Sequence, residues 1–164
     1  MAKYTILTPA VAQAGGYGPE MEALEQIGAE IVECAPNAEA FIAAAPNADA
    51  IYAKGMKFTR AMIEAATRAK IIALGSVGVD YVDVAAATAC GIPVTNCPDT
   101  FIEEVADHAM MLLLATHRRA IEQDRMVREG RWTEGRPQLY QYPRLMGSTL
   151  GLISFGRVAR AVAK

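Results

Sequence analysis

The sequence predicts an α/β fold in which helices cover both faces of a parallel β-sheet, and three observations predict it. Short apolar runs alternate with amphipathic or alanine-rich stretches along the first hundred residues. The connections between these runs are too short to join anything but neighbouring elements. The chain has 164 residues, of which 52% are hydrophobic and 21% charged, so it can bury a packed core and is not a disordered chain.

The expected strands share two features, a run of aliphatic or β-branched residues and a turn signal after it. The fourth run is apolar throughout, as in a strand that is buried on both faces. The five expected strands are residues 4–8, 30–34, 50–53, 71–74 and 93–96. Five β-α units of this kind predict a three-layer, flavodoxin-like domain over residues 1–99.

The expected helices of this domain begin and end at residues typical of helix termini. Thr59 and Asp83 are N-cap residues, and Gly28 and Gly91 provide left-handed C-caps. The four helices are expected at residues 19–27, 38–45, 59–68 and 83–91.

The pattern changes after the fifth expected strand, where a long helix should begin. Asp99 or Thr100 can cap it, and its charges match the helix dipole, with acidic residues in the first turn and Arg118 and Arg119 near its end. The segment 105–115 is apolar almost all round. We therefore expect this helix to be buried between units or subunits.

The rest of the chain should form an incomplete second unit that spans residues 100–164. We expect an irregular arm from Arg125 to Gly147, because the arm has few apolar side chains and needs a neighbour to order it. A sixth strand over residues 148–154 and a helix that opens at about Arg157 follow. The helix stops at the end of the chain without a cap, which predicts a longer natural protein of which this chain is a piece.

Several classes of protein are excluded by composition. No apolar stretch approaches the ~20 residues of a membrane span, and the N-terminus lacks a secretory pattern, so we expect a cytoplasmic protein. Cys34, Cys90 and Cys97 are odd in number and lack metal-ligand spacing, which favours reduced thiols over a disulfide or a metal site.

The charge of the chain is unevenly distributed. From Arg118 onward there are ten basic and four acidic residues, against six basic and fourteen acidic residues before it. Such asymmetry occurs in proteins that bind nucleic acid or phosphorylated ligands. The arginines match no recognised nucleic-acid module and have no regular aromatic interleave, so we expect no nucleic-acid partner.

A turn with the spacing of a dinucleotide-binding fingerprint follows the expected sixth strand. Gly156 stands where the backbone must approach a pyrophosphate, whose charge the helix N-terminus meets. Serine replaces the first glycine of the GxGxxG pattern and Ala159 replaces the third. Taken by itself the turn leaves an ordinary β-α turn as the alternative. The candidate cofactor-binding residues are Ser154, Phe155, Gly156, Arg157 and Val158.

An ordered series of motifs resembles the D-isomer-specific 2-hydroxyacid dehydrogenases. The resemblance covers roughly residues 71–164, and the earlier β-α repeats agree with the family in layout only. The motifs are Gly-Val-Asp-Tyr-Val-Asp at 78–83, Gly-Ile-Pro-Val-Thr-Asn-Cys-Pro at 91–98, Glu-Val-Ala-Asp-His-Ala at 104–109, Leu-Leu-Leu at 112–114, Arg-Arg at 118–119, Gly-Arg-Trp at 130–132, and Thr-Leu-Gly-Leu-Ile at 149–153 with Gly156 and Arg157.

The resemblance implies a two-domain enzyme that uses NAD or NADP to interconvert a small D-2-hydroxy acid and its 2-oxo acid. The family's substrate domain is flavodoxin-like, and the long helix crosses from it into a Rossmann cofactor domain, of which this chain would hold the first β-α unit. The helix and the arm, residues 102–144, would form a homodimer interface.

The resemblance also places a substrate site on the first domain. The loop that binds the substrate carboxylate falls on Ser76, Val77 and Gly78, and Lys54 and Gly55 face the same cleft. A turn of backbone N–H groups suits a carboxylate, and glycine allows the substrate to approach.

The resemblance assigns no catalytic residue to this chain. The family's arginine clamp, its proton-exchanging histidine and the acidic residue that binds the adenosine ribose all fall beyond residue 164, and His108 and His117 are at positions that the family does not use for catalysis. We therefore expect the isolated chain to be inactive and to bind NAD or NADP weakly. The alternative is a non-enzymatic flavodoxin-like module that binds a small acid or a partner. The sequence does not distinguish NAD from NADP, or one acid from another.

Overall fold

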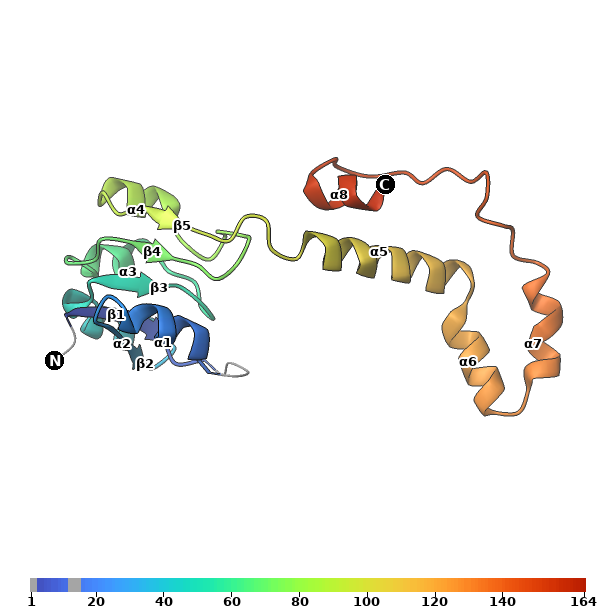
Figure 1. Ribbon diagram of the computed structural model, residues 1–164, viewed down its shortest axis with the longest axis horizontal. Coiled ribbons are helices and arrows are strands. Elements are labelled where there is room, and N and C mark those ends of the chain that lie inside the picture. The colour runs from blue at the N-terminus through green and yellow to red at the C-terminus, as the bar shows by residue number, and fades with distance from the viewer. Residues whose placement is uncertain (1–2, 12–15) are drawn as a thin grey trace. The chain divides into compact units, whose positions relative to one another are not determined.

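The computed structural model describes residues 3–11 and 16–164, and the chain divides into two compact units, residues 1–100 and 101–164. In the described residues the first unit has a five-stranded, all-parallel sheet with the strand order β2-β1-β3-β4-β5 (Figure 1). This is the flavodoxin-like order, in which the chain reverses its winding between β1 and β3. The α/β fold predicted from the sequence is confirmed.

The strands lie where the alternating apolar runs predict them, although the last three are short. Tyr4 pairs with Ala29 at one end of the first ladder and Pro9 pairs with Cys34 at the other. The strands are β1 (Tyr4–Pro9), β2 (Ala29–Cys34), β3 (Ala50–Tyr52), β4 (Ile72–Ala73) and β5 (Val94–Thr95).

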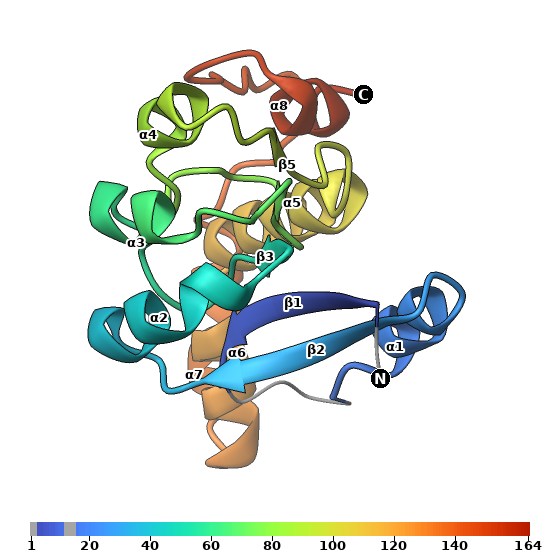
Figure 2. The ribbon, with the colours of Figure 1, turned by 90° about the vertical axis from the view of Figure 1, so that its left-hand side faces the viewer.

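Helices cover both faces of this sheet. One helix, α1, lies on one face, and α2, α3 and α4 lie on the other (Figure 2). The helices are α1 (Gly18–Glu25), α2 (Ala38–Ala44), a 3-10 turn (Ala45–Asn47), α3 (Arg60–Ala65) and α4 (Val84–Ala89).

Most of the predicted helix signals are confirmed. The Asp83 carboxylate accepts a hydrogen bond from the Ala86 N–H at 2.8 Å, which caps α4, and Gly28 and Gly91 have the left-handed φ of C-terminal glycines. Thr59 occupies the N-cap position of α3, but its side chain makes no capping hydrogen bond, and α3 ends at Ala65.

The core of the first unit lies between the sheet and the three helices on its second face. Leu7, Ile51 and Ile72 project from the strands, and Phe41 and Phe58 pack edge to face with ring centroids 5.2 Å apart. Each of these side chains is fully buried, which stabilises the fold by roughly 1.5–3 kcal/mol per side chain.

The second unit is helical, and it corrects two expectations. Its helices are α5 (Ile102–His117), α6 (Ala120–Arg128), α7 (Trp132–Leu139) and α8 (Arg157–Val162), and α8 packs against α5. The expected irregular arm, Arg125 to Gly147, instead contains the end of α6 and all of α7. Its helices are supported by local ion pairs, such as Arg128 with Asp124 at 2.8 Å, which a count of apolar residues does not register.

The sixth strand expected at residues 148–154 is the second correction. These residues form no strand, and Ile153 is fully exposed. A parallel strand requires a hydrogen-bonded neighbour, and no described residue of the second unit belongs to a strand.

The expected cap of the long helix is also wrong. Neither Asp99 nor Thr100 caps α5, because Phe101 occupies the N-cap position with a left-handed φ of 67° and no capping side-chain bond. The predicted charge pattern is present, since Glu103 and Glu104 lie in the first turn.

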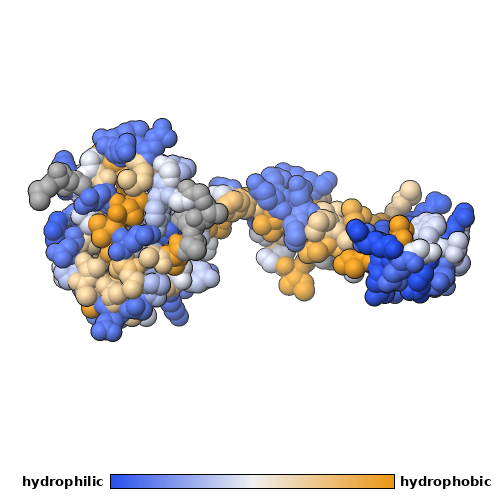
Figure 3. Space-filling view, turned by 90° about the horizontal axis from the view of Figure 1, so that it is seen from below, coloured by the Kyte–Doolittle hydropathy of each residue, from blue (hydrophilic) through white to orange (hydrophobic). Residues whose placement is uncertain are grey.

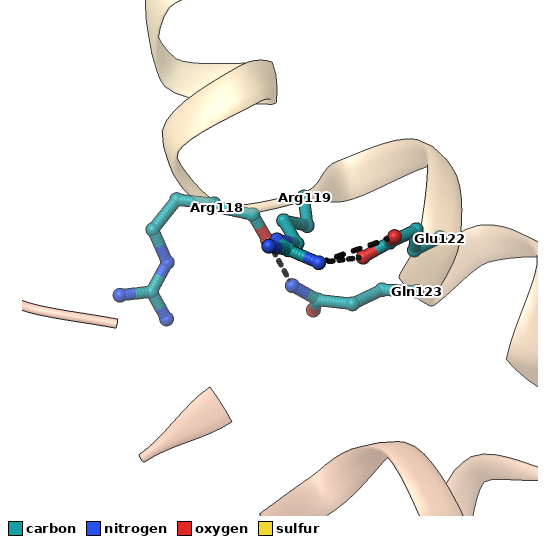
Figure 4. Close-up of polar contacts among 4 residues, drawn as sticks. All are labelled: Arg118, Arg119, Glu122 and Gln123. Atoms are coloured by element: carbon teal, nitrogen blue, oxygen red, sulfur yellow. Dashed lines mark hydrogen bonds and ion pairs between the residues drawn. The ribbon is translucent and has the colours of Figure 1, made fainter. Parts of the chain in front are cut away.

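The junction between α5 and α6 is fixed by polar contacts. Arg119, at a φ of 49°, donates from Nη1 to both carboxylate oxygens of Glu122, at 3.3 and 3.2 Å, and the Gln123 side chain donates to the Arg118 carbonyl (Figure 4). The His117 ring also donates from Nε2 to the carbonyl oxygen of Pro143 at 2.8 Å. These bonds connect the end of α5 to the segment that follows α7.

Much of the apolar surface of α5 is exposed in the single chain. Figure 3 shows hydrophobic residues at the surface along α5, beside a hydrophilic region over α6 and α7. Val105, Met111, Leu112 and Leu114 are each about half exposed, and Ala106 is buried. The expectation that another chain covers this helix stays a prediction.

Among the described residues, no helix has both the length and the apolar character that a membrane span requires.

One carboxylate connects three parts of the first unit. Asp49 precedes β3, its Oδ2 accepts from the Thr5 N–H at 3.0 Å, and its Oδ1 accepts from Arg68 Nη2 at 2.7 Å. These two bonds, the backbone bond first, hold the pKa of Asp49 below its usual value. A carboxylate with a depressed pKa stabilises the fold above its unfolded pKa and ceases to do so as the pH falls through its folded pKa.

We therefore predict that Asp49→Asn lowers the thermal midpoint of the chain by a few degrees at pH 7, and that the difference from wild type shrinks as the pH falls through the folded pKa of Asp49. Melting followed by circular dichroism at several pH values measures this. Glu64→Gln is the matched control, because Glu64 forms only an exposed ion pair with Arg60. A difference that does not shrink as the pH is lowered through the acidic range would contradict the assignment.

Candidate functional site

The loop that follows β4 has all three of its carbonyl groups engaged. The Ser76 carbonyl accepts from the Cys97 N–H at 3.0 Å, and the Val77 carbonyl accepts from Asn96 Nδ2 at 2.7 Å. The Gly78 carbonyl accepts from the Ser76 hydroxyl at 2.9 Å. Two of these donors come from the segment after β5, so the edge of the sheet fixes the loop.

In contrast to the carbonyl groups, the N–H groups of this loop have no hydrogen-bond partner among the described residues. Within the described part of the chain, the amides of Ser76, Val77 and Gly78 donate no hydrogen bond, and Val77 and Gly78 are exposed. Successive backbone N–H groups in a turn can form a concavity that binds anions, so these three amides are candidates for such a site. The loop also lies at the carboxyl edge of the sheet, where parallel α/β folds bind their ligands.

At two glycines near this loop, neighbouring side chains lie so close to the backbone that a Cβ atom would crowd them. A Cβ atom on Gly78 would lie 3.0 Å from Oδ2 of Asp80, and one on Gly75 would lie 2.6 Å from the Tyr52 hydroxyl. The Tyr52 hydroxyl therefore rests directly on the backbone that leads into the loop.

Lys54 and Gly55 follow β3 at the same edge of the sheet. Gly55 has a left-handed φ of 70°, and a Cβ atom there would collide with the side chain of Val11, lying 3.1 Å from its Cβ. The ammonium of Lys54 lies 3.9 Å from the centroid of the Tyr17 ring and 5.4 Å from that of Tyr52. Only glycine fits this turn without strain.

Burial and the neighbouring charges shift the pKa of Lys54 in opposite directions. Partial burial lowers the pKa of Lys54, while the carboxylates of Glu33 and Glu20 oppose this by favouring its charged form. The rings of Tyr17 and Tyr52 also favour the charged ammonium, through the negative face of each ring.

Each of these carboxylates is held by a tyrosine hydroxyl. Tyr17 donates to Glu33 Oε1 at 2.7 Å, and burial together with this bond raises the pKa of Tyr17 to about 12. Burial and a hydrogen bond to Glu20 also raise the pKa of Tyr52. The carboxylates and the ammonium therefore form one ordered cluster.

Five residues of this site escaped the sequence analysis, and one of them is Glu20 of α1. Asn96, Glu33 and Tyr52 each lie at or next to the carboxyl end of a strand, and the rule that ligands bind at that edge could have found them. Tyr17 lies outside any such position, in the turn before α1. No signal in the sequence indicates that its ring meets Lys54.

An apolar groove of about 640 Å³ opens on the face of the sheet that carries α1. Aliphatic side chains of α1, β1 and β3 line most of it. Its polar lining includes Glu20 and Tyr52, and Gly75 and Cys97 also line it, so it borders both the Lys54 cluster and the start of the loop.

The candidate cofactor residues do not form a complete nucleotide site in this chain. Ser154 has a left-handed φ of 76°, which favours glycine, and Phe155 is exposed. Gly156 is the N-cap of the six-residue α8, and Arg157 and Val158 open that helix. Without a strand before the turn, no sheet edge presents these residues to a pyrophosphate.

The two histidines of the chain belong to the second unit. His108 is an exposed residue of α5, and the ring of His117 is bonded to the Pro143 carbonyl. Among the described residues, no three His, Cys, Asp or Glu side chains gather to hold a metal ion.

The strand order defines the class of protein, a doubly wound α/β domain, and domains of this class bind small ligands at the carboxyl edge of the sheet. The family model of the D-isomer specific 2-hydroxyacid dehydrogenase catalytic domain matches residues 16–161. The chain belongs to this family.

Relatives of known sequence and structure agree with this assignment. A glyoxylate reductase of Thermococcus onnurineus is 40% identical over 107 residues, 63% of this chain and 32% of that protein. A D-3-phosphoglycerate dehydrogenase of Mycobacterium bovis is 36% identical over 130 residues, 79% of this chain and 24% of that protein.

The structure also resembles that of an NADPH-dependent glyoxylate/hydroxypyruvate reductase from Sinorhizobium meliloti, solved in complex with NADP and malonate. The match has a TM-score of 0.76 at 33% identity, and it covers 99% of this chain and 49% of the other. The chain thus spans about half the length of this solved relative.

The turn at Gly55 leads to a prediction with a matched control. Gly55 and Gly91 share a φ of 70°, but a Cβ atom on Gly91 would meet nothing within 4 Å. Gly91→Ala should cost about 1 kcal/mol of unfolding free energy for the left-handed backbone alone, and Gly55→Ala about 1–3 kcal/mol more because Val11 must move. Urea denaturation of both variants measures the difference. Equal losses would show that the Val11 contact is not formed.

Proposed function

We propose that this chain provides the substrate-binding part of a dehydrogenase that uses NAD or NADP to interconvert a D-2-hydroxy acid and its 2-oxo acid by hydride transfer. One observation carries the proposal. The loop of Ser76, Val77 and Gly78 has its carbonyls bonded and its N–H groups available, in a chain that belongs to the 2-hydroxyacid dehydrogenase family.

In this proposal the loop binds the carboxylate that every 2-hydroxy and 2-oxo acid carries. The N–H groups of Val77 and Gly78 donate to its oxygens, and the bonds from Asn96 and Cys97 keep the loop from rearranging. Lys54 and Gly55 border the other end of the bound acid.

The nicotinamide cofactor would supply or accept the hydride when bound. Residues 154–158 are the proposed start of its pyrophosphate site, and in this chain they are not presented by a strand. We therefore expect the 164-residue chain alone to transfer no hydride and to bind NAD only in the millimolar range, about −4 kcal/mol. A micromolar dissociation constant by calorimetry would contradict this.

We further propose that residues 102–144 form a homodimer interface. The support is the half-exposure of Val105, Met111, Leu112 and Leu114 on α5, because large exposed apolar surfaces mark interfaces. A monomer in sedimentation at tens of micromolar would count against the interface.

The carboxylate loop is tested by binding rather than turnover. We predict that D-glycerate binds the chain in the millimolar range and that Gly78→Ala weakens binding about fivefold to tenfold, about 1 kcal/mol. The added methyl group lies at the ligand surface and 3.0 Å from Asp80 Oδ2.

Gly151→Ala is the control for this substitution, since a Cβ atom on Gly151 meets nothing within 4 Å. Its affinity for D-glycerate should equal that of wild type. Unchanged binding by Gly78→Ala, with its thermal midpoint preserved, would remove the loop from the proposed site.

A further inference from the structure

The Lys54 ammonium is enclosed by a fixed set of groups at the point where the sheet reverses its winding. It lies over the Tyr17 ring at 3.9 Å and beside the Tyr52 ring at 5.4 Å. The carboxylates of Glu33 and Glu20 act on it electrostatically. These groups come from three segments of the chain, namely residues 17–20, Glu33 and residues 52–54, so the cluster is a product of the fold.

The cluster contains one cation and two carboxylates, so its formal charge is −1. The carboxylates cannot easily turn away, because the Tyr17 hydroxyl holds Glu33 at 2.7 Å and Tyr52 is hydrogen-bonded to Glu20. Lys54 is therefore not a spare positive charge. To a ligand, the cluster presents a weakly negative, polar surface.

The cluster lies next to the carboxylate loop. Tyr52 connects the two, because the Lys54 ammonium rests on its ring while its hydroxyl touches the backbone at Gly75, the residue before Ser76. Glu20, Tyr52 and Gly75 also line the same groove. A ligand that is held at the loop and extends toward β3 meets the cluster with its far end.

We propose that Glu33 and Glu20 determine the charge specificity of this site by neutralising Lys54, so that the site takes small acids with one negative charge and rejects acids that carry a second anionic group. The inference rests on the proposed function, since it assumes that the loop binds the carboxylate. The far end of the ligand is then a hydrogen atom, an alkyl group or a hydroxymethyl group. A phosphate or a second carboxylate there would face two fixed carboxylates.

This inference separates two kinds of substrate that the relatives leave open. Both a glyoxylate reductase and a D-3-phosphoglycerate dehydrogenase match the chain. Only the second of the two acids in these names carries a phosphate group, and proteins bind phosphate through charge-assisted hydrogen bonds from arginine and lysine. The charge balance around Lys54 favours the acid without phosphate.

The test compares D-glycerate with 3-phospho-D-glycerate, which share the carboxylate and the 2-hydroxyl group and differ in the phosphate. Both are titrated into the full chain at pH 7.5 and constant ionic strength, and the dissociation constants are measured by calorimetry or NMR. Wild type should bind D-glycerate at least as tightly as 3-phospho-D-glycerate. Salt must be matched, because the expected repulsion is screened.

The decisive variant is Glu33→Gln, which keeps an oxygen that can accept the Tyr17 hydrogen bond and removes one negative charge. It should tighten the binding of 3-phospho-D-glycerate about fivefold, by the Coulomb energy of a doubly charged phosphate near one fewer carboxylate, and tighten D-glycerate binding by a clearly smaller factor, because the single charge of D-glycerate is held at the loop. Adding Lys54→Gln should abolish the gain. Glu64→Gln, a substitution of a carboxylate on α3 that pairs with Arg60, should change neither constant.

The possible outcomes distinguish a failure of the charge inference from a failure of the proposed carboxylate site. If wild type binds 3-phospho-D-glycerate several-fold more tightly than D-glycerate, Lys54 is an anion site and this inference is wrong, while the loop remains. An unchanged ratio in a folded Glu33→Gln variant also overturns it, and Glu20→Gln provides the same test if Glu33→Gln fails to fold. If wild type binds neither acid, the loop itself fails, and the charge inference fails with it.

Discussion

The bonds that join the segment after β5 to the loop after β4 are the constraint on which the rest of the site depends. β4 and β5 pair over only two residues each, and the Asn96 side chain and the Cys97 amide extend the contact beyond the strands. These bonds occupy the loop carbonyls and leave its N–H groups available. In the proposed function, anion binding at this edge follows from how the last two strands meet, and it needs no charged side chain of the loop.

Backbone geometry also fixes the arrangement of residues at the end of β3. The chain must turn at Gly55 against Val11, which fixes the position of Lys54. The tyrosines then determine what that lysine can do, because each holds a carboxylate close to it. An isolated lysine beside an acid-binding site would suggest a residue that binds phosphate. The carboxylates of Glu33 and Glu20 instead neutralise the charge of Lys54.

The sequence predicted local features well and long-range ones poorly, for physical reasons. Strand positions follow from apolar runs, and Gly28 and Gly91 follow from the left-handed backbone that only glycine adopts easily. The helices of the arm were missed because ion pairs such as Arg128 with Asp124 support them in place of an apolar face. The strand at 148–154 was expected from composition, but a strand depends on partners that no window of sequence contains. The Tyr17 contact with Lys54 joins residues 37 positions apart, and no local sequence pattern predicts a contact between them.

The central claim is that free backbone N–H groups of the loop bind the carboxylate of a small acid. The most direct test is an amide NMR titration of the full chain with D-glycerate. The account predicts that the amide resonances of Ser76, Val77 and Gly78 shift most, and that they move together along one binding curve. Shifts confined to other residues, such as the arginines of α6 and α8, with the three loop amides unmoved at saturation, would contradict it.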